Sequence, residues 1–533
     1  MSTEKKFWVE KLAEEVREKF KVSLYRTENG VGASGIPHIG SISDAVRSYG
    51  VKLALEEFGL KAEHIAFSDD KDGLRKVPHG FPEELKNHIG KPVTSVPDPF
   101  RCHESYGDHM SSMLLDALDT FGIEYKFMSG TRVYKSGFLN PQIHAILVNA
   151  KKVGEIILEV TGQEKYTHVL PYLPVCANCG RIYTTEAVSY DPNTRSVEYV
   201  CVGGEIAGKW YEGCGFKGER KISEGEGKLV WKSEFAARWA ALRINFEAYG
   251  KELTDSVATN DRICREVLRV EPPVHTRYEL FLNKQGKKLS KSAGELITHT
   301  EWLKYGSPQS LLLLMFKRFE GAREVGLEDI PIYMNEYDVL EEIYFGKRRL
   351  EDKSELVDKI SLYRYSNLLR IPPKPTLHPP YNLVVYLCRI APKENTVEYV
   401  LNKLADYGYK PLDDYERNDL LKRINYAMNW ARDFETISVE VTLDEEERAL
   451  VKSVAQLLLE QTNEEGYQAV VYQVAKQKGV EPKRVFRALY KALLGQESGP
   501  RFSSYVSAMG KQNVVERLVK AAEDSKTTTS SSS

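Results

Sequence analysis

Two short motifs, far apart in this chain of 533 residues, contain residue types that can bind a triphosphate nucleotide and promote reaction at its phosphates. The first is Pro37-His38-Ile39-Gly40, which follows a strand-like run and opens a helix. The second is Lys288-Leu289-Ser290-Lys291-Ser292, in a lysine-rich, glycine-punctuated segment. Attack on the α-phosphorus needs donors where negative charge develops and cations that follow the departing pyrophosphate. The His38 imidazole and the helix start suit the first task, and the ammonium groups of Lys288 and Lys291 suit the second.

The glycines before the first motif allow other interpretations. The run from Gly30 to Gly35 matches G-x-G-x-x-G, which in dinucleotide-binding proteins opens a helix and precedes an acidic residue by about 20 positions. Here Pro37 follows the last glycine, we expect Ser41 or Ser43 to cap the helix, and the acidic strand end at Asp69 comes too late. A dinucleotide-dependent oxidoreductase and a simple connecting turn are therefore the alternatives. The residues predicted to contact the nucleotide are Ser34, Gly35, Pro37, His38, Gly40, Lys288, Ser290, Lys291 and Ser292.

The surrounding pattern predicts the elements that position these motifs. Apolar spacing predicts a helix over 5–20, a strand over 22–27, a helix over 41–58 and a buried strand over 62–68, with Asp69-Asp70 at its end. Ligands of doubly wound sheets bind at the carboxyl ends of the strands. We therefore predict an α/β fold with a Rossmann-type, doubly wound parallel sheet and an all-α C-terminal domain.

Two groups of cysteine, histidine and aspartate residues have the spacing of metal ligands. Four cysteines could form a tetrahedral thiolate site, with buried or unpaired cysteines as the alternative: Cys176, Cys179, Cys201 and Cys214. A second set offers one carboxylate, one thiolate and two imidazoles, although its last member could lie on a helix surface: Asp98, Cys102, His103 and His109. Either site would be structural, pinning an insertion with little core of its own.

The composition narrows the class of protein. With 74 basic and 76 acidic residues the net charge is −2, which argues against a charge-driven nucleic-acid binder but not against an RNA partner read by local patches. Seven cysteines do not make a disulfide framework. No apolar run of membrane-spanning length and no signal segment is apparent, so we expect a cytoplasmic protein with no membrane partner.

The changes in pattern along the chain predict its domains. They are a first half of the catalytic domain over 1–97, a zinc-bearing insertion over 98–230, a second catalytic half over 231–325, a helical domain over 326–524, and a disordered tail over 525–533.

Longer stretches identify a family. The chain resembles the class I aminoacyl-tRNA synthetases and, more closely, the class I lysyl-tRNA synthetases of archaea and some bacteria, over nearly its whole length. Residues 64–78, 96–109 and 494–501 carry this resemblance together with the two motifs. The resemblance implies activation of lysine with ATP and Mg²⁺, then transfer to the 2′-hydroxyl of tRNA(Lys). It also implies up to two structural Zn²⁺ ions, held by the two sets above, and an anticodon-binding helical domain. We expect the protein to be a monomer.

The amino-acid pocket departs from the family pattern. The resemblance places Gly30, Gly32, Phe235 and Tyr278 in this pocket. The family usually has threonine at Gly32, Asp-Trp at Glu234-Phe235 and histidine at Leu253. Lysine is the predicted substrate. The alternatives are a class I synthetase of different specificity and a synthetase-like RNA-binding protein without ATP turnover.

Overall fold

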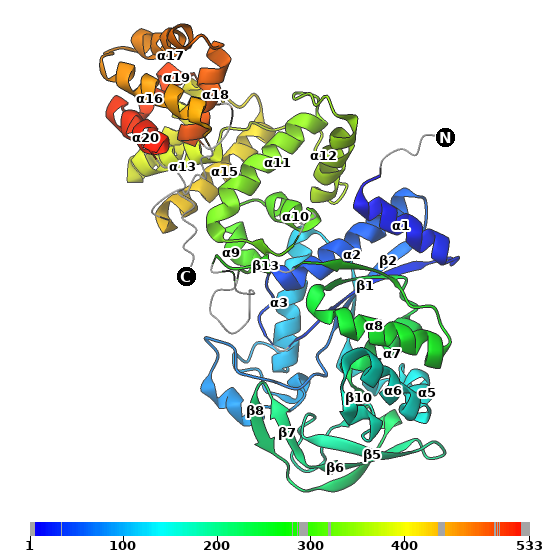
Figure 1. Ribbon diagram of the computed structural model, residues 1–533. Helices are drawn as coiled ribbons and strands as arrows, with labels where there is room; N and C mark the ends of the chain where they lie inside the picture. Colours follow the sequence, from blue (N-terminus) through cyan, green and yellow to red (C-terminus); the bar gives the residue numbers. More distant parts are fainter. Residues whose placement is uncertain are drawn as a thin grey trace, which may run out of the picture. The chain divides into compact units, whose positions relative to one another are not determined.

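A computed structural model describes residues 6–33, 35–279, 281–284, 286, 297–317, 321–434, 443–494, 497, 499 and 501–523. The chain divides into two compact units (Figure 1). The first is built from the described residues of 1–301, 311–326 and 350–371, and the second from those of 302–310, 327–349 and 372–533. Ser34, the Lys288–Ser292 motif and the tail predicted over 525–533 lie outside the described residues.

A five-stranded parallel sheet forms the centre of the first unit. Its order is β12-β11-β1-β2-β3, so the chain leaves β1 in one direction for β2 and β3 and returns to its other side for β11 and β12. This is the doubly wound arrangement, with its switch point between β1 and β11. The predicted Rossmann-type fold is thus confirmed. The strands are β1 (Tyr25–Val31), β2 (Ala62–Ser68), β3 (Lys126–Ser129), β11 (Phe246–Gly250) and β12 (Val274–Tyr278).

Helices cover both faces of this sheet. Helix α2 crosses from β1 to β2 and α8 from β11 to β12, and because right-handed crossovers run in opposite directions from the switch point, the two helices lie on opposite faces. Helix α1 packs beside α2, and α7 beside α8. The bounds are α1 (Trp8–Lys19), α2 (Ile39–Glu57), α7 (Trp231–Leu242) and α8 (Thr254–Ile263).

The segment between β2 and α7 adds helices and small antiparallel sheets. Strand β3 falls within the insertion predicted over 98–230, although it pairs with β2 in the main sheet. The helices are α3 (Tyr106–Phe121), α4 (Gly130–Lys135), α5 (Asn140–Val148) and α6 (Ala150–Thr161). The paired strands are β4 (Tyr172–Pro174) with β10 (Gly227–Leu229), β7 (Gly203–Ile206) with β8 (Lys209–Glu212), and β6 (Ser196–Cys201) between β5 (Thr185–Asp191) and β9 (Lys217–Lys221).

The second unit is helical, as predicted for the C-terminal domain. A buried ion pair between Asp338 and Arg423 lies in its core, and His378 Nε2 is 2.7 Å from Glu341 Oε2 beside it. The helices are α11 (Ile330–Tyr344), α13 (Tyr381–Ile390), α14 (Thr396–Asp406), α15 (Asp414–Asp433), α16 (Glu445–Leu459), α17 (Glu464–Lys478), α18 (Pro482–Leu494), α19 (Phe502–Met509) and α20 (Lys511–Glu523). Helix α12 (Lys353–Ser366) belongs to the first unit.

None of the helices in the described parts of the chain combines the length and the apolar character that crossing a membrane would require.

Candidate active site

His38 forms the start of helix α2. It is the N-cap residue, with extended backbone, and its Nδ1 accepts a 3.0 Å hydrogen bond from the amide of Gly40. The predicted caps Ser41 and Ser43 lie inside the helix instead. Because Nδ1 is an acceptor, the proton of the neutral ring is on Nε2, which makes Nε2 a donor. A Cβ at Gly40 would lie 2.7 Å from the His38 ring, so the glycine is what lets the imidazole fold onto the helix.

The first amides of α2 are already engaged. The amide of Ile39 donates to the carbonyl of Ile297 at 3.0 Å, and those of Ser41 and Ile42 donate to the carbonyl of His38. The sequence predicts phosphate binding at this helix start, but these three amides already donate to carbonyl groups. In the structure the helix start contributes its dipole field and the His38 ring at this edge.

Both flanks of the lysine-rich segment contact α2. Ile297 follows directly after residues 287–296 and accepts the bond from Ile39 next to His38. On the other flank, the Tyr278 hydroxyl at the end of β12 donates to the Asp44 carboxylate, and the Arg47 guanidinium lies 4.4 Å from the Tyr278 ring centre. Lys288 and Lys291 lie outside the described residues, so the structure shows only that Ile297 and Tyr278, on either side of them in the sequence, contact α2.

A narrow cavity of about 50 Å³ opens at the switch point between β1 and β11. Three of the four predicted pocket residues line it, and the fourth, Tyr278, lies beside it against the lining residue Asp44. Three carboxyl groups, those of Asp44, Asp69 and Glu247, line it against a single guanidinium, and burial raises the pKa of each of the three. The lining residues are Gly30, Gly32, Asp44, Asp69, Trp231, Phe235, Arg238, Glu247, Ala248, Tyr249, Leu253, Val257 and His275.

Arg238 holds the floor of this cavity. Its side chain is 1% exposed and reaches Glu28 at 2.5 Å, Asp69 at 3.0 Å and Glu247 at 3.4 Å. Burial raises the pKa of each carboxyl group, and the positive charge of Arg238 opposes that rise. A Cβ at Gly30 would lie 2.8 Å from the guanidinium, so the glycine makes room for it. The sequence did not predict this residue, because its partners come from three separate places in the chain: Glu28 within β1, Asp69 after β2 and Glu247 within β11.

A second buried cation lies behind the cavity wall. Lys228 pairs with Asp72 and, at 2.6 Å, with Glu234. The Tyr134 hydroxyl donates to Glu234 at 2.9 Å, and the Trp231 indole donates to Asp72 at 3.2 Å. Burial raises the pKa of Glu234 to about 7, against the lowering effect of Lys228. The pair fixes Trp231 and thereby one wall of the cavity.

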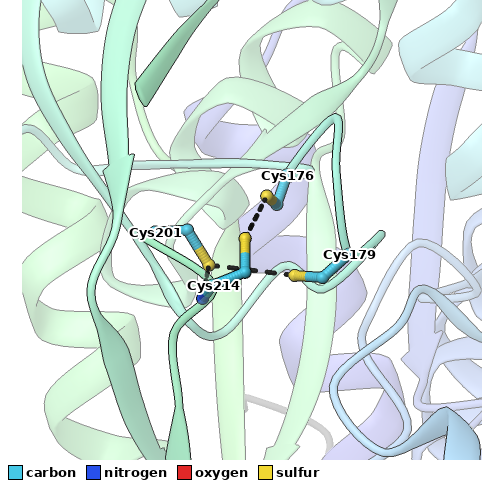
Figure 2. Close-up of side chains that lie close together, drawn as sticks. All are labelled: Cys176, Cys179, Cys201 and Cys214. Atoms are coloured by element: carbon cyan, nitrogen blue, oxygen red, sulfur yellow. Dashed lines mark hydrogen bonds between the residues drawn. The ribbon is translucent and has the colours of Figure 1, made fainter. Parts of the chain in front are cut away.

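The four predicted cysteines meet at one point (Figure 2). The sulfur atoms of Cys176 and Cys214 are 3.5 Å apart, and those of Cys179 and Cys201 are 3.8 Å apart. A tetrahedron of Zn–S bonds of 2.3 Å has edges of about 3.8 Å, so the spacing fits a zinc ion. The β7–β8 hairpin occupies the long interval between Cys201 and Cys214, and by turning back it brings Cys214 beside Cys201.

The second predicted set also converges. Cys102 Sγ lies 3.1 Å from His103 Nδ1, 3.2 Å from His109 Nδ1 and 3.3 Å from Asp98 Oδ2. Asp98 is buried, and its oxygens accept the amides of Phe100, Cys102 and His103. His109 stands in the first turn of α3 with its ring toward the other donors. One carboxylate, one thiolate and two imidazoles suit Zn²⁺ as well.

Comparisons with known proteins place the chain in a family. A model described as tRNA synthetases class I (K) matches residues 6–368, which is more than half of the chain. The chain belongs to the class I lysyl-tRNA synthetases. A second model, described as an anticodon binding domain, matches residues 418–522, that is, α15 to α20.

Relatives carry the same family name. The chain is 45% identical over 513 residues to the lysine–tRNA ligase of Cenarchaeum symbiosum (strain A), covering 95% of this chain and 97% of that protein. It is 31% identical to the lysine–tRNA ligase of Rickettsia conorii, covering 91% of each. It is 28% identical to that of Methanosphaera stadtmanae, covering 96% and 99%. The resemblance found in the sequence is confirmed.

The departures from the family pattern gather around the cavity. Gly32, Phe235 and Leu253 all line it. Glu234 instead points to Lys228 behind the wall. Three positions at which the resemblance predicts other residues in the family therefore lie at the cavity, together with the acidic side chains of its lining.

Proposed function

We propose that the chain activates lysine with ATP and transfers the lysyl group to the 2′-hydroxyl of tRNA(Lys), acting as a monomer in the cytoplasm. Membership of the family supports the reaction. The acidic cavity at the switch point, next to the His38-capped helix, is the observation that carries the proposal. Its excess of carboxylates favours a cationic amino acid, and Trp231, Phe235 and Tyr249 supply aromatic walls for an ammonium group.

In the first step the lysine carboxylate attacks the α-phosphorus of ATP in line. A bond forms between the carboxylate oxygen and phosphorus, the bond to the bridging oxygen breaks, and pyrophosphate leaves with that electron pair. His38 Nε2 donates to a phosphate oxygen, and the dipole of α2 favours the growing negative charge. Lys288 and Lys291 hold the pyrophosphate. Mg²⁺ bound with ATP supplies further charge screening.

In the second step the terminal 2′-hydroxyl of the RNA attacks the carbonyl carbon of lysyl-adenylate, and AMP leaves. Here too the protein contributes mainly position and charge. The remaining nucleotide contacts come from Ser34, Gly35, Pro37 and Gly40 before and at α2, and from Ser290 and Ser292 in the lysine-rich motif.

Each four-donor set would hold a structural Zn²⁺. The thiolate set Cys176, Cys179, Cys201 and Cys214 ties the β7–β8 hairpin to the strands that flank it. The mixed set, in which Asp98 is buried, ties the loop before α3 to the first turn of that helix. Both ions would serve to hold segments that have little apolar core of their own.

Amino-acid-dependent exchange between ATP and pyrophosphate tests this proposal. The assay should use all twenty amino acids, with and without tRNA, because some class I enzymes exchange only with tRNA bound. We expect exchange with lysine alone among them. Exchange with another amino acid would identify that amino acid as the substrate in place of lysine. No exchange at all would favour a synthetase-like RNA-binding protein, and NAD retained on purification would favour an oxidoreductase.

A further inference from the structure

His299 is a buried histidine that the proposed reaction does not use. It begins α9 (His299–Leu303), only 5% of its surface is exposed, and its Nδ1 has no hydrogen-bond partner among the described residues. It is two residues beyond Ile297, whose carbonyl accepts the amide of Ile39 next to His38. Buried polar side chains are usually fully hydrogen-bonded, so a histidine with one unpaired nitrogen at this place calls for an explanation.

Helix α3 holds the His299 imidazole through two contacts. His299 Nε2 lies 3.3 Å from Oδ2 of Asp116, and because a carboxylate only accepts, Nε2 carries the proton and donates it to this bond. The ring of Phe121, further along α3, meets the imidazole edge to face, with 6.3 Å between the ring centres. Asp116 is exposed, whereas Phe121 is buried. The position of His299 is therefore set by α3, through one hydrogen bond and one ring contact.

The short segment from Ile297 to Glu301 links this position to α2. Thr298 Oγ1 accepts the amide of Glu301 at 3.1 Å, and Glu301 Oε2 accepts the amide of Thr298 at 2.9 Å, which is a capping box. These reciprocal bonds fix the backbone on both sides of His299. The Ile297 carbonyl then accepts the amide of Ile39, the first residue of α2, at 3.0 Å. The residue before Ile39 carries the imidazole that we propose contacts the phosphates, so this bond restrains its backbone.

Helix α3 is itself attached to other fixed parts of the first unit. Its first turn carries His109 of the mixed donor set, and the hydroxyl of Ser111 lies 2.7 Å from that of Ser68 at the end of β2. From His109 to Phe121 the helix rises by about 18 Å. Since α3 is attached to the sheet before it reaches His299, it can serve as a rigid support for that residue.

We propose that His299 is a positioning residue for the reaction: α3 fixes His299, and His299 fixes the Ile297 carbonyl that orients the first turn of α2 and thereby the His38 imidazole. The inference rests on the proposed function, which gives His38 its role at the phosphates. His299 itself touches no reacting atom. It contributes by keeping the His38 donor in one orientation while negative charge develops on the phosphate oxygens.

Asp116→Ala tests the proposal from its exposed end. The change removes the acceptor of the His299 bond without opening the core, because the Asp116 side chain is 69% exposed. Lysyl-adenylate formation at saturating lysine and ATP should slow about fivefold, because small misplacements of a catalytic group slow a reaction, while the KM for lysine stays at the wild-type value. Asp116→Asn keeps a carbonyl oxygen that accepts from Nε2, so it should restore the rate to within about twofold of wild type.

The control is Asp119→Ala, one turn further along the same helix. Asp119 is also exposed, and its carboxylate accepts a hydrogen bond from the Tyr125 hydroxyl at 3.0 Å. This variant should form lysyl-adenylate at the wild-type rate. A normal rate in Asp116→Ala, equal slowing in the two alanine variants, or no rescue by Asp116→Asn would each overturn the proposal.

A double-variant cycle decides whether the effect passes through His38. If α3 acts only by orienting His38, Asp116→Ala should cause no further slowing in a chain that already carries His38→Ala. A further loss of about fivefold in that chain, equal to the loss in wild type, would overturn the proposal.

Hydrogen exchange of the Ile39 amide gives a measurement that needs no activity. Because that amide donates to the Ile297 carbonyl, its exchange should be faster in Asp116→Ala than in wild type and unchanged in Asp119→Ala. Unchanged exchange in Asp116→Ala would overturn the proposal. A wild-type chain that forms no lysyl-adenylate would overturn the proposed function instead, and the exchange of Ile39 would still decide whether α3 fixes the start of α2.

Discussion

The start of α2 and the cavity at the switch point lie at the same edge of the sheet but are built in different ways. At the start of α2, His38 is positioned by Gly40, two residues away, through one hydrogen bond. At the cavity, Arg238 is positioned by Glu28, Asp69 and Glu247, which come from three different strands or strand ends. One site is encoded locally and the other by the tertiary fold. We therefore expect changes at the cavity to affect stability most, and changes at the helix start to affect chemistry most.

The largest effect should follow from removing the charge of Arg238. In Arg238→Met three buried carboxylates lose their shared cation, and breaking a buried ion pair costs about 3–5 kcal/mol. The free energy of unfolding, measured with urea, should fall by that amount. The matched control is Arg370→Met, which breaks the exposed pair with Glu124 and should cost less than about 1 kcal/mol. Equal losses in the two variants would contradict the difference between the sites.

Glu234 should make the cavity wall sensitive to pH. Its pKa in the folded protein, about 7, lies above the ordinary value of 4.5. Between these values the folded state binds more protons than the unfolded state, so the free energy of unfolding falls as pH rises. The stability of wild type relative to Glu234→Gln should drop by up to about 3 kcal/mol from pH 4.5 to pH 7 and stay level above it. A difference that does not change with pH would show that folding does not raise the pKa of Glu234.

The same contrast explains what the sequence could predict. The strand over 62–68 matches β2, and the helix over 41–58 matches α2 to within two residues at each end, because their apolar periodicity is a local property. The convergence of both metal-ligand sets was also predicted. The pair Cys176 and Cys179 and the run from Asp98 to His109 are short motifs, whereas the β7–β8 hairpin is what brings Cys201 and Cys214 together. The strand predicted over 22–27 is observed at Tyr25–Val31, because Asn29-Gly30, which reads as a turn, continues the strand beside buried Arg238. The cations Arg238 and Lys228 were missed, since no local pattern shows that a charged residue will be buried with acids from elsewhere.

The helix start should respond in rate rather than in stability. His38→Ala removes the donor that we propose binds the phosphates, and it should slow lysyl-adenylate formation at least about tenfold, the scale of one lost transition-state contact. Lys291→Ala should slow lysyl-adenylate formation to a similar extent, because the departing pyrophosphate loses one of the two lysine side chains that hold it. Single-turnover formation of lysyl-adenylate is the measurement, with urea unfolding beside it. The His38 change also removes an N-cap, so a loss of about 1 kcal/mol in stability is expected; a normal rate would exclude His38 from the reaction.

Gly40→Ala should have the smallest effect on the reaction rate. It should also separate the effect on rate from the effect on stability most clearly. The added Cβ would lie 2.7 Å from the His38 ring, so the imidazole must turn away from the helix even though it is still present. Small misplacements of a catalytic group slow a reaction, and we expect adenylate formation to slow about threefold, less than in His38→Ala. Alanine is a better helix residue than glycine by up to about 1 kcal/mol, so the free energy of unfolding should not fall. Ser41→Ala, one residue further along the helix, is the control and should leave the rate unchanged. If Gly40→Ala lost stability while keeping its rate, the glycine would serve the fold, and the local positioning of His38 would not be what the reaction depends on.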